Sequence, residues 1–161
     1  ACGKGGKWDR ALRILEEMHR SGVAPDIISY STAIGVLEKS SRHDEADRMY
    51  RRAVTAGLFA EFWRDGDSTL DLHGASEAAA RTVLRVFLSD VRSGVHRQRQ
   101  DLIVVTGRGK NSPGEPVLLT SVRAFLHEVA GPTVTEDSSN PGCFVLTKAS
   151  IDEWKANKSV P

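Results

Sequence analysis

An aspartate and a histidine two residues apart supply the groups that a general base or a metal site needs. The segment LDLHG (70–74) contains Asp71 and His73, and side chains two positions apart on a strand share one face, roughly 6 to 7 Å apart. We therefore predict Asp71 and His73 as catalytic residues, with Asp71 also as a ligand for Mg²⁺. The alternative is that both side chains only hydrogen-bond to nearby backbone and fix the turn at Gly74.

A second motif, TGRGKNS (106–112), combines glycines with cations. Gly107 and Gly109 leave room for backbone amides to approach a phosphate, and Arg108 and Lys110 supply positive charge. Lys110 is also a candidate catalytic residue, because it could neutralise charge in a transition state. The segment is not a GxxxxGK[ST] loop, and no GxGxxG follows a strand, so the sequence disfavours a nucleotide cofactor.

Basic residues gather between these two motifs. Residues 81–110 contain seven lysines and arginines against two acids, in a chain whose 22 basic and 21 acidic residues nearly balance. At 100° per residue, Arg81, Arg85 and Arg92 lie on one side of a predicted helix. Such a stripe suits a phosphate backbone, so we predict these arginines as nucleic-acid contacts. An ordinary solvated helix surface is the alternative.

Composition excludes several classes of protein. The 161 residues include no apolar run of 18 or more, which argues against a membrane span. Two cysteines, Cys2 and Cys143, fit neither a zinc motif nor a disulfide framework. The first residues contain no charged-then-apolar leader and are typical of the middle of a helical unit, so we expect any targeting segment to lie outside this sequence.

Both chemical motifs fall at the ends of predicted strands in the C-terminal part of the chain. Apolar periodicity and turn residues predict a βαβαββ order, an α/β domain built as a two-layer sandwich. Its elements are strands at 69–73, 102–106, 134–136 and 143–147, and helices at 76–92 and 118–129. Ser150 and Glu153 have capping-box spacing and predict a last short helix from Ser150, within a terminal segment at 150–161.

The N-terminal part repeats with a period of 35 residues, which aligns Lys4 with Lys39 and Gly22 with Gly57. Three apolar stripes predict helices, the first at about 8–21, so each repeat is a helical hairpin. Hairpins of this kind need about three stacked units for stability, and we expect a longer array upstream. The predicted domains are a repeat segment (1–62), a linker (63–68) and the α/β domain (69–149).

The repeat pattern, Lys-x-Gly, then Ala, then Glu-Glu-Met-x-x-x-Gly-Val-x-Pro-Asp, resembles the pentatricopeptide repeat (PPR) family over residues 1–26 and more loosely over 27–61. That resemblance implies binding of single-stranded RNA, about one base per repeat. The residues that would read bases are Asp26, which closes the first unit, and Ser31, which opens the second. Glu61 departs from the Asp or Asn usual at that position. Ordinary helix capping is the alternative for Asp26 and Ser31.

The LDLHG and TGRGK motifs, the βαβαββ order and the late Asn140-x-Gly142 together resemble the Smr (small MutS-related) domain over about 68–148. Asn111 stands where that domain frequently has histidine. With the repeats, the chain resembles organellar PPR-SMR proteins, which implies RNA binding, a chloroplast more than a mitochondrion, and metal-assisted endoribonuclease activity. A non-catalytic RNA clamp and a module that docks on nucleoid or transcription proteins remain alternatives, and DNA is a second substrate class. We expect no nucleotide cofactor and no membrane partner.

Overall fold

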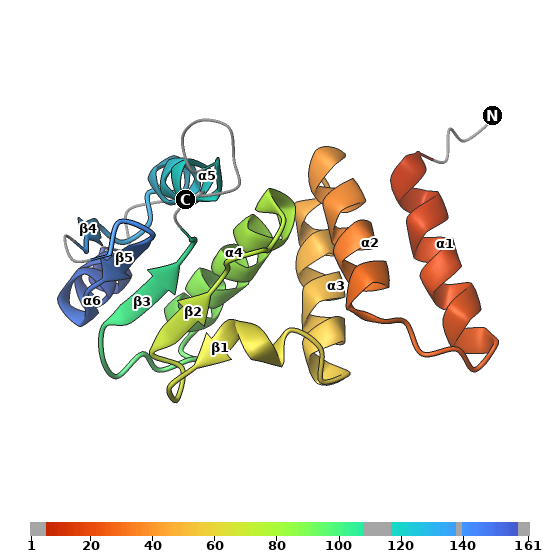
Figure 1. Cartoon of the computed structure of the whole chain (residues 1–161), viewed down its shortest axis with the longest axis horizontal. Helices are drawn as coiled ribbons and strands as arrows, with labels where there is room; N and C mark the ends of the chain where they lie inside the picture. Colours follow the sequence, from red (N-terminus) through yellow and green to blue (C-terminus); the bar gives the residue numbers. More distant parts are fainter. Residues whose placement is uncertain (1–5, 108–116, 138–139, 158–161) are drawn as a thin grey trace. The chain divides into compact units, whose positions relative to one another are not determined.

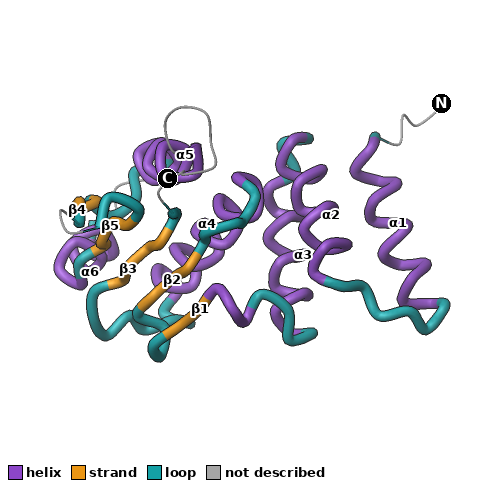
Figure 2. The backbone as a smooth tube through the Cα atoms, in the orientation of Figure 1, coloured by secondary structure: helices purple, strands orange, loops and turns teal. Residues whose placement is uncertain are grey.

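The computed structural model describes residues 6–107, 117–137 and 140–157. The chain divides into two compact units, Ala1–Ala60 and Glu61–Pro161. Within the described residues, none of the helices combines the length and apolar composition that crossing a membrane requires. Figures 1 and 2 show the helical first unit and the mixed second unit. The predicted fold class, helical repeats followed by an α/β domain, is confirmed.

The first unit consists of three helices, α1 (Lys7–Arg20), α2 (Ile27–Lys39) and α3 (His43–Thr55). Helix α1 ends at Arg20, and just beyond its cap the positive φ of Gly22 (71°) lets the chain reverse while the amide of Val23 donates to the carbonyl of Met18. Helix α2 packs against both of its neighbours. The core consists of buried side chains from all three helices, including Leu15, Tyr30, Ile34, Leu37, Met49 and Tyr50.

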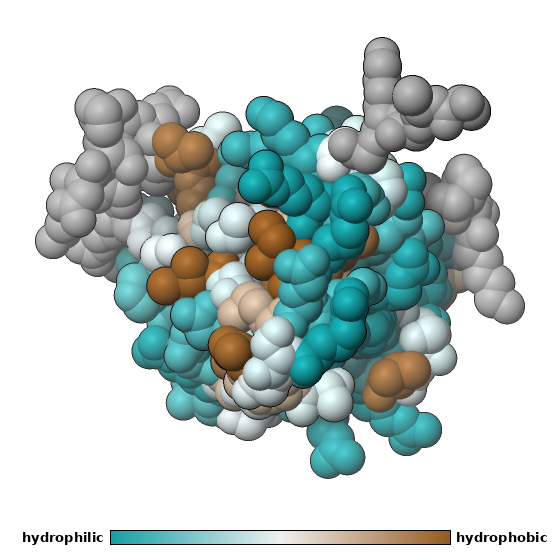
Figure 3. Space-filling model, turned by 90° about the vertical axis from the view of Figure 1, so that its right-hand side faces the viewer, coloured by the Kyte–Doolittle hydropathy of each residue, from teal (hydrophilic) through white to brown (hydrophobic). Residues whose placement is uncertain are grey.

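The surface of the first unit carries some apolar side chains. Ile14 is 48% exposed and Ile28 is 71% exposed. Figure 3, which looks from the side on which α1 lies, shows separate brown patches set among hydrophilic teal residues. Isolated apolar side chains of this kind are common on protein surfaces.

The second unit begins with a short 3₁₀ turn, η1 (Ala60–Phe62), and is built around a five-stranded sheet. The strands stand in the order β1-β2-β3-β5-β4, and among the described strands β2 and β3 pair in parallel while the other neighbouring pairs are antiparallel. The strands are β1 (Trp63–Arg64), β2 (Thr69–Asp71), β3 (Leu102–Val105), β4 (Val134–Glu136) and β5 (Cys143–Leu146), and the helices are α4 (Glu77–Ser93), α5 (Val117–Glu128) and α6 (Lys148–Ala156).

The sheet has one buried and one more open face, as a two-layer sandwich requires. Strand register places Leu70, Val104 and Phe144 in one row, and all three are fully buried. The adjacent row includes Ile103, which is 39% exposed. Helix α4 runs behind the β2–β3 part of the sheet in Figure 1. This helical layer covers the apolar face, and the βα connections leave the ends of β2 and β3 free to carry polar groups.

Two local predictions differ from the structure. The segment predicted as a linker, 63–68, contains β1, which pairs with β2 through Trp63 opposite Leu70. A contact between the Trp63 and Phe87 rings, 5.6 Å between centroids, anchors this hairpin to α4. The last helix begins at Lys148 rather than Ser150, because the side chain of Thr147 caps it by accepting a hydrogen bond from the Ser150 amide (3.1 Å).

Candidate functional site

The described residues of the two polar motifs lie close together because β2 and β3 are parallel and end at the same edge of the sheet. Asp71 is opposite Val105 in the register, and beyond it the amide of Leu72 donates to the carbonyl of Val105 (2.7 Å). The residues that follow the two strands therefore lie side by side. This edge, at the carboxyl ends of the parallel strands, is where open α/β sheets place their ligands.

Asp71 and His73 form a hydrogen-bonded pair at this edge. Nδ1 of His73 lies 2.7 Å from Oδ1 of Asp71, and the backbone amide of His73 donates to the same oxygen (3.1 Å). The pair is closer than strand alternation predicts, because β2 ends at Asp71 and the chain turns so that the Ala75 amide donates to the Leu72 carbonyl. The Asp71 side chain is 7% exposed and that of His73 is 65% exposed, so the carboxylate is buried beneath an accessible imidazole.

Arg64 completes the surroundings of Asp71, and sequence reasoning did not identify it. Its guanidinium lies 2.8 Å from Oδ2 of Asp71. Burial would raise the pKa of the Asp71 carboxyl, but hydrogen bonds from the side chain and backbone of His73, with the charges of His73 and Arg64, outweigh burial and lower that pKa. Arg64 comes from β1, inside the segment predicted as a linker, so no sequence signal pointed to it.

Gly107, the last described residue of the second motif, lies next to His73. Its φ is 80°, and a Cβ built on it would lie 3.6 Å from the Cβ of His73. The amides of Thr106 and Gly107 both donate to the carbonyl of Gly142 (2.9 and 3.1 Å), so the turn before β5 reaches the same edge. Arg108, Gly109, Lys110 and Asn111 lie outside the described residues.

The predicted arginine stripe on α4 is largely used inside the second unit. The guanidinium of Arg81 pairs with Glu128 (2.7 Å) and lies over the Phe125 ring, while that of Arg92 lies 4.3 Å from the centroid of the Trp154 ring. Arg85 donates to the hydroxyl of Thr82 (3.4 Å). The contacts of Arg81 and Arg92 hold α4 against α5 and α6, whereas the bond of Arg85 lies within α4. Phosphate binding by these three arginines stays a prediction.

In the first unit, Asp26 caps α2. Its Oδ1 accepts hydrogen bonds from the amide (2.8 Å) and hydroxyl (2.7 Å) of Ser29, and these bonds lower the pKa of the Asp26 carboxyl. Ser31 lies half-buried in the same helix. The structure thus gives Asp26 the capping role that was the alternative to base recognition, and recognition of a base by Asp26 or Ser31 stays a prediction.

The predicted metal role of Asp71 does not fit its environment. A carboxylate that binds Mg²⁺ must offer an oxygen directly to the cation. Both oxygens of Asp71 already accept charged or polar donors, His73 at Oδ1 and Arg64 at Oδ2, and the side chain is 7% exposed. Within the part of the chain that the structure describes, no group of three or more metal-ligating side chains comes together. We therefore derive no step through a metal.

The fold and this edge define a helical-repeat segment joined to a two-layer α/β domain that carries a carboxylate–imidazole pair. Comparison with protein families agrees: the Smr domain family matches residues 70–139, and the PPR repeat family matches residues 1–23 and 28–58. A comparison with curated proteins gave no match. Along the chain, the matches to pentatricopeptide repeats precede the match to the Smr domain. PPR repeats point to RNA binding, and Smr is a nuclease-associated domain.

Proposed function

We propose that this chain binds single-stranded RNA and that its Smr domain cleaves RNA at the Asp71–His73 pair. The observation that carries the proposal is the buried, ionised carboxylate that orients an exposed imidazole beside Gly107. In a pair of this kind the carboxylate fixes the tautomer and stabilises the imidazolium that forms when histidine accepts a proton. The helical repeats would supply the affinity for single-stranded RNA.

The chemistry follows from which histidine nitrogen faces solvent. Nδ1 faces the carboxylate and carries the hydrogen, which leaves Nε2 as the basic nitrogen. Nε2 takes the proton of a ribose 2′-hydroxyl, the 2′-oxygen forms a bond to the adjacent phosphorus, and the bond from phosphorus to the 5′-oxygen breaks. The leaving 5′-oxygen takes a proton from water or from Lys110, which follows Gly107 by three residues in the sequence. The products are a 2′,3′-cyclic phosphate and a 5′-hydroxyl.

End-labelled RNA incubated with the purified chain tests this mechanism. Replacing His73→Ala removes the base, and Asp71→Asn leaves the imidazole without its orienting carboxylate, so we expect each change to slow cleavage by about 10² to 10⁴-fold. His127→Ala, at an exposed histidine elsewhere in the Smr domain, is the matched control and should cleave at the original rate.

Three results would contradict the proposal. They are cleavage that survives His73→Ala, products that end in a 5′-phosphate, and cleavage of an RNA whose 2′-hydroxyl is methylated at the cut site. Since no step passes through a metal, activity should persist in EDTA, and abolition by EDTA with rescue by Mg²⁺ would restore the metal-assisted mechanism that the sequence predicted. Single-stranded DNA lacks the 2′-hydroxyl and should remain intact.

A second candidate function is RNA binding without cleavage. Two features of the sequence favour this candidate. The site has a single identified carboxylate, Asp71, and Asn111 stands at a position where the Smr domain frequently has a titratable histidine. A clamp of this kind could protect a transcript end or recruit nucleoid or transcription proteins. It predicts unchanged RNA affinity in His73→Ala and no cleavage by the original chain under any metal condition.

We also propose that the protein acts in an organelle, with the chloroplast favoured over the mitochondrion. The combination of PPR repeats with an Smr domain supports this, through the resemblance to organellar PPR-SMR proteins. Immunodetection in purified organelles is the test, and detection in the cytosol alone would contradict the proposal.

A further inference from the structure

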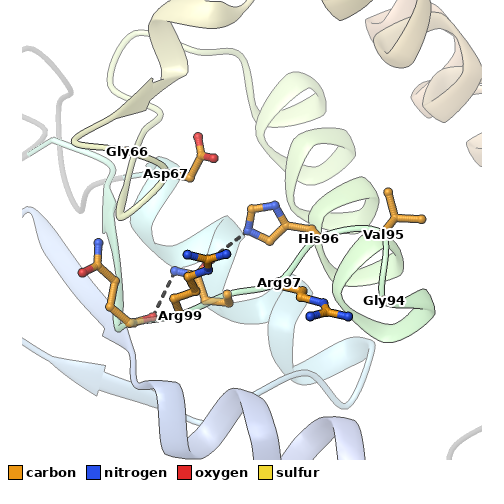
Figure 4. Close-up of a pocket in the computed structure, with 9 residues that line it drawn as sticks. Gly66, Asp67, Gly94, Val95, His96, Arg97 and Arg99 are labelled. Carbon is orange, nitrogen blue, oxygen red and sulfur yellow. Dashed lines mark hydrogen bonds between the residues drawn. The ribbon is translucent and has the colours of Figure 1, made fainter.

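A polar pocket opens at the end of the parallel strands opposite to the His73 site. It has a volume of about 580 Å³ and is lined by residues 94–100, which lead from α4 into β3, and by Gly66 and Asp67 in the turn between β1 and β2. Figure 4 shows Asp67 on one side of this hollow and His96, Arg97 and Arg99 projecting from the other segment. Gly66 and Asp67 precede β2, and residues 94–100 precede β3, whereas His73 and Gly107 follow these strands. The two sites therefore lie at opposite ends of the parallel strands.

Partly buried hydrogen bonds hold the segment 94–100 in shape. The side chain of Gln98 is 8% exposed; its Nε2 donates to the carbonyl of Gln100 (3.0 Å), and its Oε1 lies 2.9 Å from Nε2 of His96. The His96 ring also contacts Phe87 edge-on, with centroids 5.4 Å apart. A segment braced by a buried amide and by ring packing keeps its outward residues in place before any ligand binds.

The outward residues next to Gln98 are arginines. Arg97 and Arg99 are exposed, and within the described residues neither makes an ion pair. Asp67 is the single acid among the lining residues. By contrast, the guanidinium groups of Arg64 and Arg81 are already paired, with Asp71 and Glu128 respectively. The pocket therefore presents two available guanidinium groups, which suit phosphate oxygens because each can donate two parallel hydrogen bonds.

We propose that this pocket is a second RNA contact, in which Arg97 and Arg99 bind backbone phosphates of a strand that also reaches the His73 edge. The inference rests on the proposed RNA-binding function and extends it to a site that the LDLHG and TGRGKNS motifs do not include. Strands of three and four residues, at about 3.3 Å per residue, separate the two edges by about 10 to 13 Å. An RNA that touches both must therefore span several nucleotides.

The test measures how the affinity of the 161-residue chain for a labelled, unstructured RNA depends on salt. Each phosphate contact to a single strand contributes a slope of about 0.7 in log K against log salt. Arg97→Gln with Arg99→Gln should flatten the slope by about 1.4, so the original chain loses about sevenfold more affinity than the variant between 50 and 200 mM salt. The control, Arg123→Gln with Lys155→Gln, removes two exposed or half-exposed charges from α5 and α6 and should leave the slope unchanged.

The outcomes separate this inference from the proposed function. If the original chain binds no RNA, the proposed function fails and this inference fails with it. If the chain binds RNA but the arginine variant keeps the full slope, the pocket is not an RNA contact, although the proposed function stands. Uridine monophosphate could instead shift the NMR resonances of His96 in the original chain but not in the arginine variant, while the variant keeps the full salt slope for RNA. In that case the pocket serves a free nucleotide and the inference is overturned.

Discussion

The short distance between Gly107 and His73 gives a prediction for which Gly74 serves as the control. Gly107 and Gly74 have nearly equal positive φ angles, 80° and 78°. A Cβ at Gly107 would lie 3.6 Å from the Cβ of His73, an ordinary van der Waals contact, whereas a Cβ at Gly74 would meet nothing within 4 Å. Alanine at either position therefore incurs the same backbone strain, about 1 to 2 kcal/mol, and no clash.

Differential scanning calorimetry of the whole chain measures this strain. For a unit of about 100 residues, each kcal/mol lowers the melting temperature by about 4 to 8 °C, so Gly107→Ala and Gly74→Ala should lower the Smr-domain transition by similar amounts. Valine places further carbons about 1.5 Å beyond Cβ. At Gly107 these carbons reach towards His73, and displacement of a catalytic group by about 1 Å can lower a rate by about 10²-fold.

We therefore expect Gly107→Val to reduce RNA cleavage much more than Gly74→Val, at similar stability. Unequal melting temperatures for the two alanine variants would refute the shared-strain argument. Equal cleavage by the two valine variants would show that the loop after β3 does not border the reacting group.

Two further predictions concern stability. Because the pKa of Asp71 is lowered in the folded state, its ionisation stabilises the fold above the ordinary aspartate pKa of about 4, and this contribution is lost as the pH falls through the folded-state pKa. Urea unfolding at a series of pH values should therefore show a steeper acid decline for the original chain than for Asp71→Asn, and parallel curves would contradict this. Thr147→Ala should cost about 1 kcal/mol by removing the cap of α6, whereas Ser150→Ala should cost less, because Ser150 lies inside the helix. Chemical denaturation compares the two, and a larger loss in Ser150→Ala would restore the start of the helix predicted from sequence.

Much of the secondary structure could be predicted because its signals are local. Apolar side chains recur at helical spacing from Trp8 to Met18, and α1 forms there. The apolar, β-branched run at 102–106 became β3. Strand β1 escaped prediction because two residues carry no periodicity, and Trp63 becomes a strand residue only through pairing with Leu70 and packing on Phe87.

The candidate site was predictable in its parts but not in its connections. Asp71, His73 and Gly107 were identified from motif chemistry, because residue type and spacing limit what such segments can do. The role of the α4 arginines was not predictable, because helical spacing shows which side chains share a face and not what faces them. In the structure, Arg81 faces Glu128 and Phe125 of α5, and Arg92 faces Trp154 of α6.

The amino-acid sequence by itself determined the order of the longer helices and strands and which residues carry groups capable of chemistry, since these depend on residue type and on neighbours within a few positions, and it determined the repeat period by its internal similarity. Tertiary structure alone decided that Arg64 neutralises Asp71, that Gly107 borders His73, and that residues 94–100 form a braced pocket. The reason is that strand register and helix packing join residues far apart in the chain, and no local pattern encodes those distances.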